Sequence, residues 1–362
     1  MNATQAMFVS LLSPMVLAFI LGVIATRVKS DLKFPEELYT ALTIYLLVAI
    51  GLKGGYKLSI SNLGDFWRPG LAAVALGIVI PIVSYYILRH LGKFNVWNAA
   101  AIAAHYGSVS AVTFGEAVAF HDTLKEEALR AAIEAGRIAA GTAADAPAAL
   151  EVYKAQGLNY EGFMPSLLTI MEVPAILVAI IIARLQGKEE AFGSDEGGSA
   201  GEILRELLAG KSTLLLIGFL LIGYISGKRG WEQVSPWFDA PFRGVLTLFL
   251  LEAGLVTGRR LEDLKKVGPF LIGFGILTPI ACAVMGIAVG KAVGLTMAGA
   301  TILGVLAASA SYIAAPAACR VALPKASPTY YLTASLAVTF PFNIIVGLPL
   351  YHLIAVKMYG LS

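Results

Sequence analysis

The chain has 362 residues, of which 57% are hydrophobic and only 14% charged, and its mean hydropathy is +0.76. Soluble domains carry about 25% charged residues, so this composition excludes a water-soluble globular protein and indicates a polytopic membrane protein. The net charge of +3 gives no reason to expect a nucleic-acid partner, and the two cysteines, Cys282 and Cys319, lie in apolar runs without the spacing of a metal site.

A helix crosses the membrane with about 20 mostly apolar residues. Ten segments are candidates, and several shorter ones are completed by flanking residues. The first segment lacks a basic leader and a cleavage site, so we interpret it as a retained helix. In chain order the predicted spans are 7–26, 36–53, 69–89, 97–120, 164–185, 212–227, 242–257, 268–291, 297–322 and 328–357.

Five predicted spans precede the polar stretch 186–211 and five follow it. An odd number of spans in each half inverts the second half relative to the first. We therefore predict an all-α membrane fold of two inverted five-helix repeats, residues 1–185 and 212–362. The glycine-, serine- and charge-rich stretch 186–211 is predicted to be a flexible cytoplasmic linker.

Lysine and arginine favour the cytoplasmic side of a membrane protein. Placing both termini outside puts fifteen of the 27 basic residues in cytoplasmic segments, which favours that orientation. Residues 121–162 then form a long outer loop. The loop begins with an amphipathic charged helix, 122–140, which we interpret as a surface helix rather than a binding module.

Two stretches of the chain resemble one another at a spacing of 203 residues. Residues 47–58 align without gaps on 250–261, with Leu, Gly, Leu, Gly and Leu matching at five of the twelve positions. The same spacing aligns 106–110 with 309–313, inside the fourth and ninth predicted spans. Duplicated membrane proteins with two interrupted helices are typically secondary transporters that hold their substrate where the breaks meet.

The first predicted break contains residues suited to bind an anion. Gly107 destabilises a helix, and Ser108, Ser110 and Thr113 offer hydroxyl groups at membrane depth. A helix that restarts here presents free N–H groups and the positive end of its dipole, which bind anions without lysine or arginine. The carbonyl groups that end the preceding half can bind sodium.

The second predicted break repeats this composition. It contains Ser309 and Ser311, and Pro316 suits the first turn of a new half-helix because its missing N–H is not needed there. The alternative for both segments is that small residues serve only tight helix packing. Two breaks at corresponding positions favour the functional interpretation.

Charged residues inside spans are costly and therefore informative. Glu172, beside Pro174 in the fifth span, is the best candidate for a cation ligand or a proton acceptor. Glu116 either reaches the outer interface or takes part in function, whereas a structural ion pair is expected for Glu252. His105 lies next to the first break, where a packing role is favoured over a chemical one.

Enzyme motifs are missing from the sequence. It contains no HExxH zinc motif, no Walker A loop and no glycine-framed nucleophilic serine. We therefore expect a transporter rather than an enzyme, with a coupling ion and no cofactor.

Four motifs together resemble a known family. They occupy residues 49–55, 107–110, 171–174 and 307–313. In this order and spacing the chain resembles the sodium-dependent bicarbonate transporters known from cyanobacteria, nearly end to end except for the long outer loop.

The resemblance implies a sodium–bicarbonate symporter with a scaffold or gate domain and a mobile core that moves as an elevator. It also implies a homotrimer, and a PII-like cytoplasmic protein as a candidate regulator. Carried over by motif, it places the substrate at the two breaks. The substrate-binding candidates are Gly107, Ser108, Ser110, Thr113, Ser309 and Ser311, and the cation-binding candidates are Ser110, Ser311 and Glu172.

Two positions depart from the family pattern. Tyr312 stands where the cyanobacterial pattern has an aspartate, which removes a negative cation ligand, and Glu172 replaces an aspartate of the same charge. We expect a sodium-coupled importer of bicarbonate in a bacterial plasma membrane. The alternatives are a proton-coupled carrier of a small organic acid, with Glu172 titrating, and a membrane receptor or scaffold that signals through the 186–211 linker.

Overall fold

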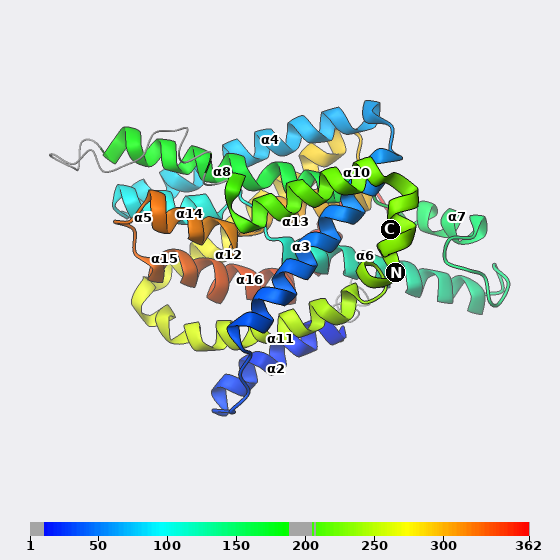
Figure 1. Cartoon of the computed structure of the whole chain (residues 1–362), viewed down its shortest axis with the longest axis horizontal. Coiled ribbons are helices and arrows are strands. Elements are labelled where there is room, and N and C mark those ends of the chain that lie inside the picture. Colours follow the sequence, from blue (N-terminus) through cyan, green and yellow to red (C-terminus); the bar gives the residue numbers. More distant parts are fainter. Residues whose placement is uncertain (1–10, 188–204, 206–207, 362) are drawn as a thin grey trace.

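The computed structural model describes residues 11–187, 205 and 208–361, which form a bundle of helices without a β-strand in that part of the chain (Figure 1). The helices of the first half are α2 (Pro14–Arg27), α3 (Glu36–Ser59), α4 (Leu63–Tyr86), α5 (Val96–His105), α6 (Ala111–Glu134), α7 (Pro147–Ala155) and α8 (Met164–Gly187). Those of the second half are α10 (Lys211–Phe238), α11 (Phe242–Arg260), α12 (Leu264–Ala292), α13 (Met297–Ala308), α14 (Ala314–Ala322), α15 (Pro328–Leu332), α16 (Phe340–Phe342) and α17 (Leu348–Tyr359).

Six helical runs of the described residues are long and apolar enough to cross a membrane. They are Glu36–Ser59, Leu63–Leu91, Met164–Gly187, Lys211–Phe238, Phe242–Ala292 and Pro328–Tyr359. The run from Phe242 to Ala292 contains two of the predicted spans. At the two breaks, α5, α13 and α14 are too short to qualify singly, while α6 is long enough but is not among the apolar runs. The chain is therefore a multi-pass helical membrane protein.

Two glycines mark the ends of predicted spans. The helical run of α10 is kinked at Gly227, where φ is 55°, and that of α12 at Gly268, where φ is 79°. Predicted span 212–227 ends at Gly227, and predicted span 268–291 begins at Gly268. Glycine permits these left-handed conformations because it has no Cβ. The helical segment after Gly227, which extends to Phe238, was not predicted.

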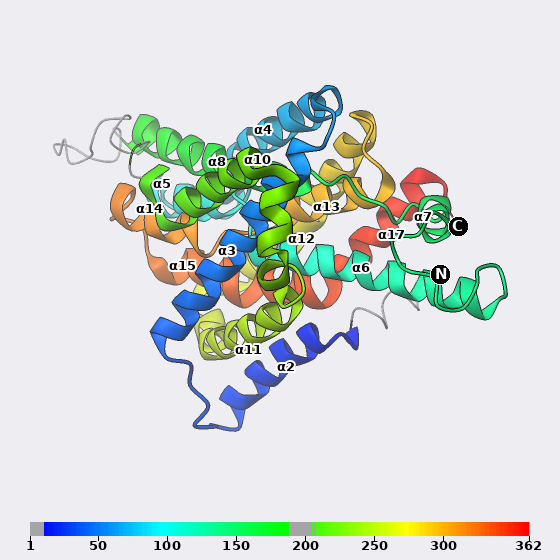
Figure 2. The ribbon, with the colours of Figure 1, turned by 45° about the vertical axis from the view of Figure 1, so that its right-hand side comes forward.

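Helices α2 and α11 pack closely, as do α3 and α10 (Figures 1 and 2). A Cβ built on Gly254 of α11 would lie 2.1 Å from the carbonyl oxygen of Phe19 in α2, and one on Gly55 of α3 would lie 2.0 Å from that of Leu220 in α10. Small residues let membrane helices approach in this way. These glycines hold the four helices together as two tight pairs.

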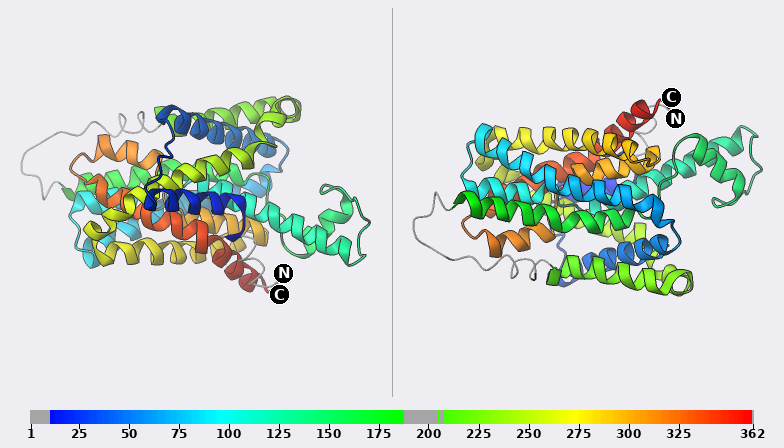
Figure 3. Two further views of the ribbon diagram at one scale, coloured as in Figure 1. Left: turned by 90° about the horizontal axis from the view of Figure 1, so that it is seen from below. Right: turned by 90° about the horizontal axis from the view of Figure 1, so that it is seen from above.

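The remaining long helices form the rest of the bundle, in which α4 packs on α8 and α12 on α13 (Figure 3).

The helices that carry the two breaks begin with side-chain caps. The Asn95 side chain accepts a hydrogen bond from the Asn98 N–H at 2.8 Å before α5, and the Thr296 hydroxyl accepts one from the Gly299 N–H at 3.1 Å before α13. Such caps satisfy N–H groups that lack a partner in the first turn.

The prediction of a separate helix over 122–140 within a loop is wrong. Helix α6 runs without interruption from Ala111 to Glu134, and α7 follows over Pro147–Ala155. The two helices project from one end of the bundle (Figure 3). The polar residues after His121 continue the helix because alanine, leucine and glutamate, which are frequent there, are good helix formers. The predicted outer loop 121–162 is thus largely a helical hairpin.

The C-terminal end of the chain lies beside this hairpin. A Cβ built on Gly157, just after α7, would lie 2.7 Å from the Leu361 side chain. The predicted linker 186–211 falls mostly outside the described residues. Helix α8, which precedes it, ends at Gly187, and α10, which follows it, begins at Lys211.

Candidate functional site

Two helices are interrupted at the predicted positions. Helix α5 ends at His105 and α6 begins at Ala111, while α13 ends at Ala308 and α14 begins at Ala314. Ala308 follows His105 by 203 residues and Ala314 follows Ala111 by the same number, which is the spacing of the sequence repeat. The predicted breaks in the fourth and ninth spans are confirmed, and their borders correspond residue by residue.

Gly107 makes the first break possible. Its φ is +96°, a conformation that residues with a side chain rarely adopt. A Cβ at this position would lie 2.8 Å from Cδ of Pro81 in α4. Backbone conformation and space both require glycine here, so the helix cannot continue through this residue.

The two breaks cross and bind each other through their backbones. Tyr106 and Ala310 form an isolated antiparallel bridge. The Ser311 N–H donates to the carbonyl oxygen of Ser108 at 3.1 Å, and it also lies 2.9 Å from that of His105. These contacts fix the positions of the helix ends that meet at the crossing.

Serine hydroxyls occupy the start of both half-helices. The Ser110 N–H donates to Oγ of Ser309 at 3.0 Å, and Oγ of Ser110 accepts from the Thr113 N–H at 3.2 Å. In the second break, Oγ of Ser311 accepts from the Ala315 N–H at 3.2 Å. Each capping hydroxyl still has its own hydrogen to donate, so both can bind an anion while they cap a helix.

Two backbone N–H groups at the start of α6 remain free. Those of Ala111 and Val112 have no hydrogen-bond partner within residues 11–187, 205 and 208–361, as is usual in the first turn of a helix. They lie at the positive end of the α6 dipole, inside an apolar bundle. This arrangement favours a small anion, because a buried N–H group without a partner is costly.

The crossing brings together all six predicted substrate residues, and each side chain among them is buried. Ser108 is fully buried and its hydroxyl donates to the backbone oxygen of Glu172 at 3.0 Å. The participating residues are Gly107, Ser108, Ser110, Thr113, Ser309 and Ser311. Their role in binding stays a prediction.

Glu172 touches the crossing with its backbone and not with its carboxyl group. The carboxyl oxygen Oε1 accepts a hydrogen bond from the Ser212 hydroxyl of α10 at 3.0 Å. The other oxygen, Oε2, is buried and has no partner among the described residues. A cation bound at Glu172 would therefore lie between α8 and α10, to one side of the serine cluster.

The other buried acids and His105 have distinct surroundings. Glu116 is buried at 2% exposure instead of reaching a surface, and one of its oxygens has no partner in the described part of the chain. The structural ion pair expected for Glu252 is confirmed, with Arg259 at 3.3 Å. His105 stacks on Tyr331 with ring centroids 4.7 Å apart, and its Nδ1 lies 2.7 Å from the Ala101 carbonyl oxygen. The stacking is consistent with the predicted packing role, while its other ring nitrogen, Nε2, is buried without a partner among the described residues.

Tyr312 places a phenol at the second break. Its hydroxyl is buried without a hydrogen-bond partner among the described residues, and its ring packs edge-on against Phe340 at 4.9 Å. A neutral oxygen thus stands where the cyanobacterial pattern has a carboxylate. It can accept from a donor or bind a cation, but it brings no charge.

The sequence did not reveal the residues of the last helical run that hydrogen-bond to the crossing. The Tyr106 hydroxyl lies 2.6 Å from Oγ1 of Thr339, which donates to the Gly275 carbonyl oxygen at 2.7 Å. The Asn343 amide donates to the Ala308 carbonyl oxygen, the last of α13, at 2.9 Å. Both supporting residues lie in π-helical turns, 333–339 and 343–347, which often occur at functional sites.

A helical membrane bundle with two broken helices that cross through buried serines has the architecture of a membrane transporter. A sequence profile of the Na+-dependent bicarbonate transporter superfamily matches residues 14–135 and 121–356. The chain belongs to this superfamily, as its sequence motifs had indicated. A search among curated proteins finds no match.

Proposed function

We propose that this protein is a secondary active transporter that takes up bicarbonate together with sodium, by alternating access at the crossing. The observation that carries the proposal is the crossing itself. It combines two free N–H groups, at Ala111 and Val112, with the capping hydroxyls of Ser110 and Ser311. Membership of a bicarbonate transporter superfamily supports the choice of anion.

The helix pairs support an inverted repeat, and the elevator motion that we propose with it rests on the family resemblance. The first predicted span, α2, packs on the seventh, α11, and the second, α3, packs on the sixth, α10. A two-fold axis in the membrane plane would exchange these two pairs. We assign these four helices to the scaffold or gate and the others to the mobile core, which carries the crossing.

Sodium is proposed to bind between the crossing and α8. Hard cations prefer oxygen ligands. The crossing offers the hydroxyls of Ser110 and Ser311, while the unpartnered carboxyl oxygen of Glu172 lies to one side, between α8 and α10, and would supply the negative charge of the site. With Tyr312 in place of a carboxylate the site has one negative charge fewer. Charge–charge attraction is strong in a low-dielectric interior, so the loss of one negative charge weakens the attraction for sodium markedly. We therefore expect weak sodium binding.

One observation favours proton coupling as the second candidate. The Glu172 carboxyl group is buried at 4% exposure and has no basic partner among the described residues; the Ser212 hydroxyl donates a hydrogen bond to it. A hydroxyl can donate to a carboxylate or accept from a carboxylic acid, so it suits both protonation states. A carrier of a small organic acid that uses Glu172 as its proton acceptor is consistent with this environment.

The proposal also includes orientation and assembly. Both termini and the α6–α7 hairpin are placed outside a bacterial plasma membrane, which agrees with the distribution of basic residues. Assembly as a homotrimer and inhibition by a PII-like protein rest on the family resemblance. Mass photometry of the purified protein tests the first of these.

The coupling ion is best tested by reversing the driving force. In a symporter, an inward bicarbonate gradient at constant pH must drive labelled sodium into proteoliposomes. We expect sodium uptake that stops when bicarbonate is replaced by chloride. Bicarbonate flux driven by a proton gradient in choline, without sodium movement, would support the second candidate. Absence of both fluxes would support a receptor.

A further inference from the structure

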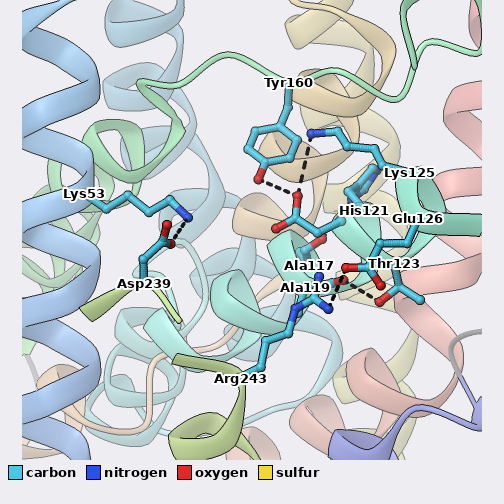
Figure 4. Close-up of polar contacts among 11 residues, drawn as sticks. Lys53, Ala117, Ala119, His121, Thr123, Lys125, Glu126, Tyr160, Asp239 and Arg243 are labelled. Carbon is cyan, nitrogen blue, oxygen red and sulfur yellow. Dashed lines mark hydrogen bonds and ion pairs between the residues drawn. The ribbon is translucent and has the colours of Figure 1, made fainter. Parts of the chain in front are cut away.

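A cavity of about 910 Å³ lies between the tight helix pairs and the rest of the bundle, beside the α6–α7 hairpin. Its walls come from the second half of α3, the middle of α6, residues 160–165 and the junction of α10 with α11 (Figure 4). Phe114 and Gly115, near the start of α6, are among its lining residues. Phe114 follows Ser110 by four residues, about 6 Å along the helix axis. Part of the cavity wall therefore lies close to the crossing.

The charged side chains that line the cavity carry a net positive charge. They comprise four cations and two carboxylates, which leaves a net charge of two positive, or of one positive when the Glu126 carboxylate that pairs with Arg243 is counted. The lining charged residues are Lys53, Lys57, Asp122, Lys125, Asp239 and Arg243. We call the cavity with these residues the lysine vestibule.

Most of the vestibule cations have a carboxylate partner. Lys53 pairs with Asp239 at 2.7 Å, and Arg243 pairs with Glu126 at 3.0 Å (Figure 4). Nζ of Lys57 has no carboxylate within 4.0 Å among the described residues, and its nearest aromatic ring is that of Tyr56, with the centroid at 5.3 Å. The vestibule thus contains one cation whose charge is not neutralised.

The third lysine is held inside the vestibule by an aromatic ring. Nζ of Lys125 lies 4.1 Å from the centroid of Tyr160 and 3.6 Å from Oδ1 of Asp122, to which the Tyr160 hydroxyl also donates at 2.9 Å (Figure 4). Burial lowers the pKa of Lys125, and the like charges of Lys53 and Lys57 lower it further, against the opposing effect of Asp122. Three ammonium groups therefore repel one another across one cavity.

We propose that the lysine vestibule is an anion-binding antechamber that captures the transported oxyanion from solution before it reaches the crossing. Lys57 is its principal ligand, and Lys125 and Lys53 complete the positive field. Clefts lined by one sign of charge raise the local concentration of the opposite ion by about 10- to 1,000-fold. The vestibule also contains carboxylates, so we expect an effect at the low end of that range. That the captured anion is bicarbonate rests on the proposed function. The positive field rests only on the charged residues that line the vestibule.

The field can be measured without transport. Ser235 lines the vestibule, so Ser235→Cys in the full chain can be modified with an anionic and a cationic methanethiosulfonate reagent in vesicles of neutral lipid. The ratio of the two rates, divided by the same ratio at Ala143→Cys in the exposed turn of the hairpin, reports the local potential. Both native cysteines are buried, and the unmodified chain supplies their background.

We expect the anionic reagent to be favoured about tenfold at low salt. Adding Lys57→Gln should reduce the ratio severalfold, while Lys57→Arg should preserve it. Sodium bicarbonate should slow the anionic reagent more than sodium chloride of equal ionic strength. A ratio near one, or a ratio that Lys57→Gln leaves unchanged, would overturn the proposal. A ratio that depends instead on added phosphatidylglycerol would assign the vestibule to lipid headgroups and also overturn it.

Uptake provides the second readout. Lys57→Gln should raise the apparent KM for bicarbonate severalfold with an unchanged maximal rate, and the difference should shrink at high salt because screening weakens the field. If the wild type moves no bicarbonate but Ser235→Cys shows charge-selective modification, the proposed function fails and the antechamber stands. Normal bicarbonate uptake together with a modification ratio near one would support the proposed function and overturn the antechamber.

Discussion

Replacing Ser110 with alanine removes one hydroxyl from the centre of the crossing. Its Oγ accepts from the Thr113 N–H at 3.2 Å, and the side chain is 4% exposed. Loss of such a cap costs about 0.5–2 kcal/mol of stability. An anion that loses a buried hydrogen-bond donor binds more weakly by about 1–3 kcal/mol, or roughly 5- to 150-fold. We therefore expect a folded protein whose apparent KM for bicarbonate is raised by about tenfold or more.

The measurement is the initial rate of labelled bicarbonate uptake into proteoliposomes against bicarbonate concentration. Ser311→Ala should behave like Ser110→Ala, and Ser110→Thr should retain affinity because it keeps the hydroxyl. Thr43→Val is the matched control, since the Thr43 hydroxyl is buried in α3 and donates to the Tyr39 carbonyl oxygen at 2.8 Å, within its own helix. If both serine variants take up bicarbonate with wild-type apparent KM, these serines are packing groups.

Three further outcomes are expected. Gly107→Ala should abolish uptake and lower the melting temperature, because its φ is +96° and a Cβ would lie 2.8 Å from a proline ring of α4. Sodium dependence of uptake should be weak in the wild type, stronger in Tyr312→Asp and lost in Glu172→Gln; steep dependence that survives Glu172→Gln would place the cation elsewhere. Gly254→Ala should destabilise the protein by about 1–3 kcal/mol, since a Cβ would lie 2.1 Å from a backbone oxygen of α2, whereas Gly244→Ala in the same helix meets nothing within 4 Å and should be neutral or stabilising. Equal melting temperatures for these two variants would refute the close packing of α2 and α11.

The breaks could be predicted from sequence because their causes are local. Gly107 and the serines that follow it cannot sustain a helix cheaply, and the same composition recurs 203 residues later at Ser309. The kinks at Gly227 and Gly268 coincide with predicted span ends for the same reason. In each case the signal is the conformational freedom of a few residues.

Other features depend on contacts between distant segments and leave no local signal. Glu172 was recognised as a buried acid, but only the packing of α8 against α10 reveals that its carboxyl group meets Ser212. The support of the crossing by Thr339 and Asn343 arises from π-helical turns that hydropathy does not register. Helix α6 was divided too early because its polarity changes near His121 while its helix propensity does not.

Sodium-coupled bicarbonate uptake is tested most directly with labelled bicarbonate in proteoliposomes at one fixed pH, with and without an inward sodium gradient. We expect accumulation above the equilibrium level when sodium is outside, and none when choline replaces it or an ionophore dissipates the gradient. Accumulation of the same size in choline, or no accumulation under either condition, would contradict the proposed coupling.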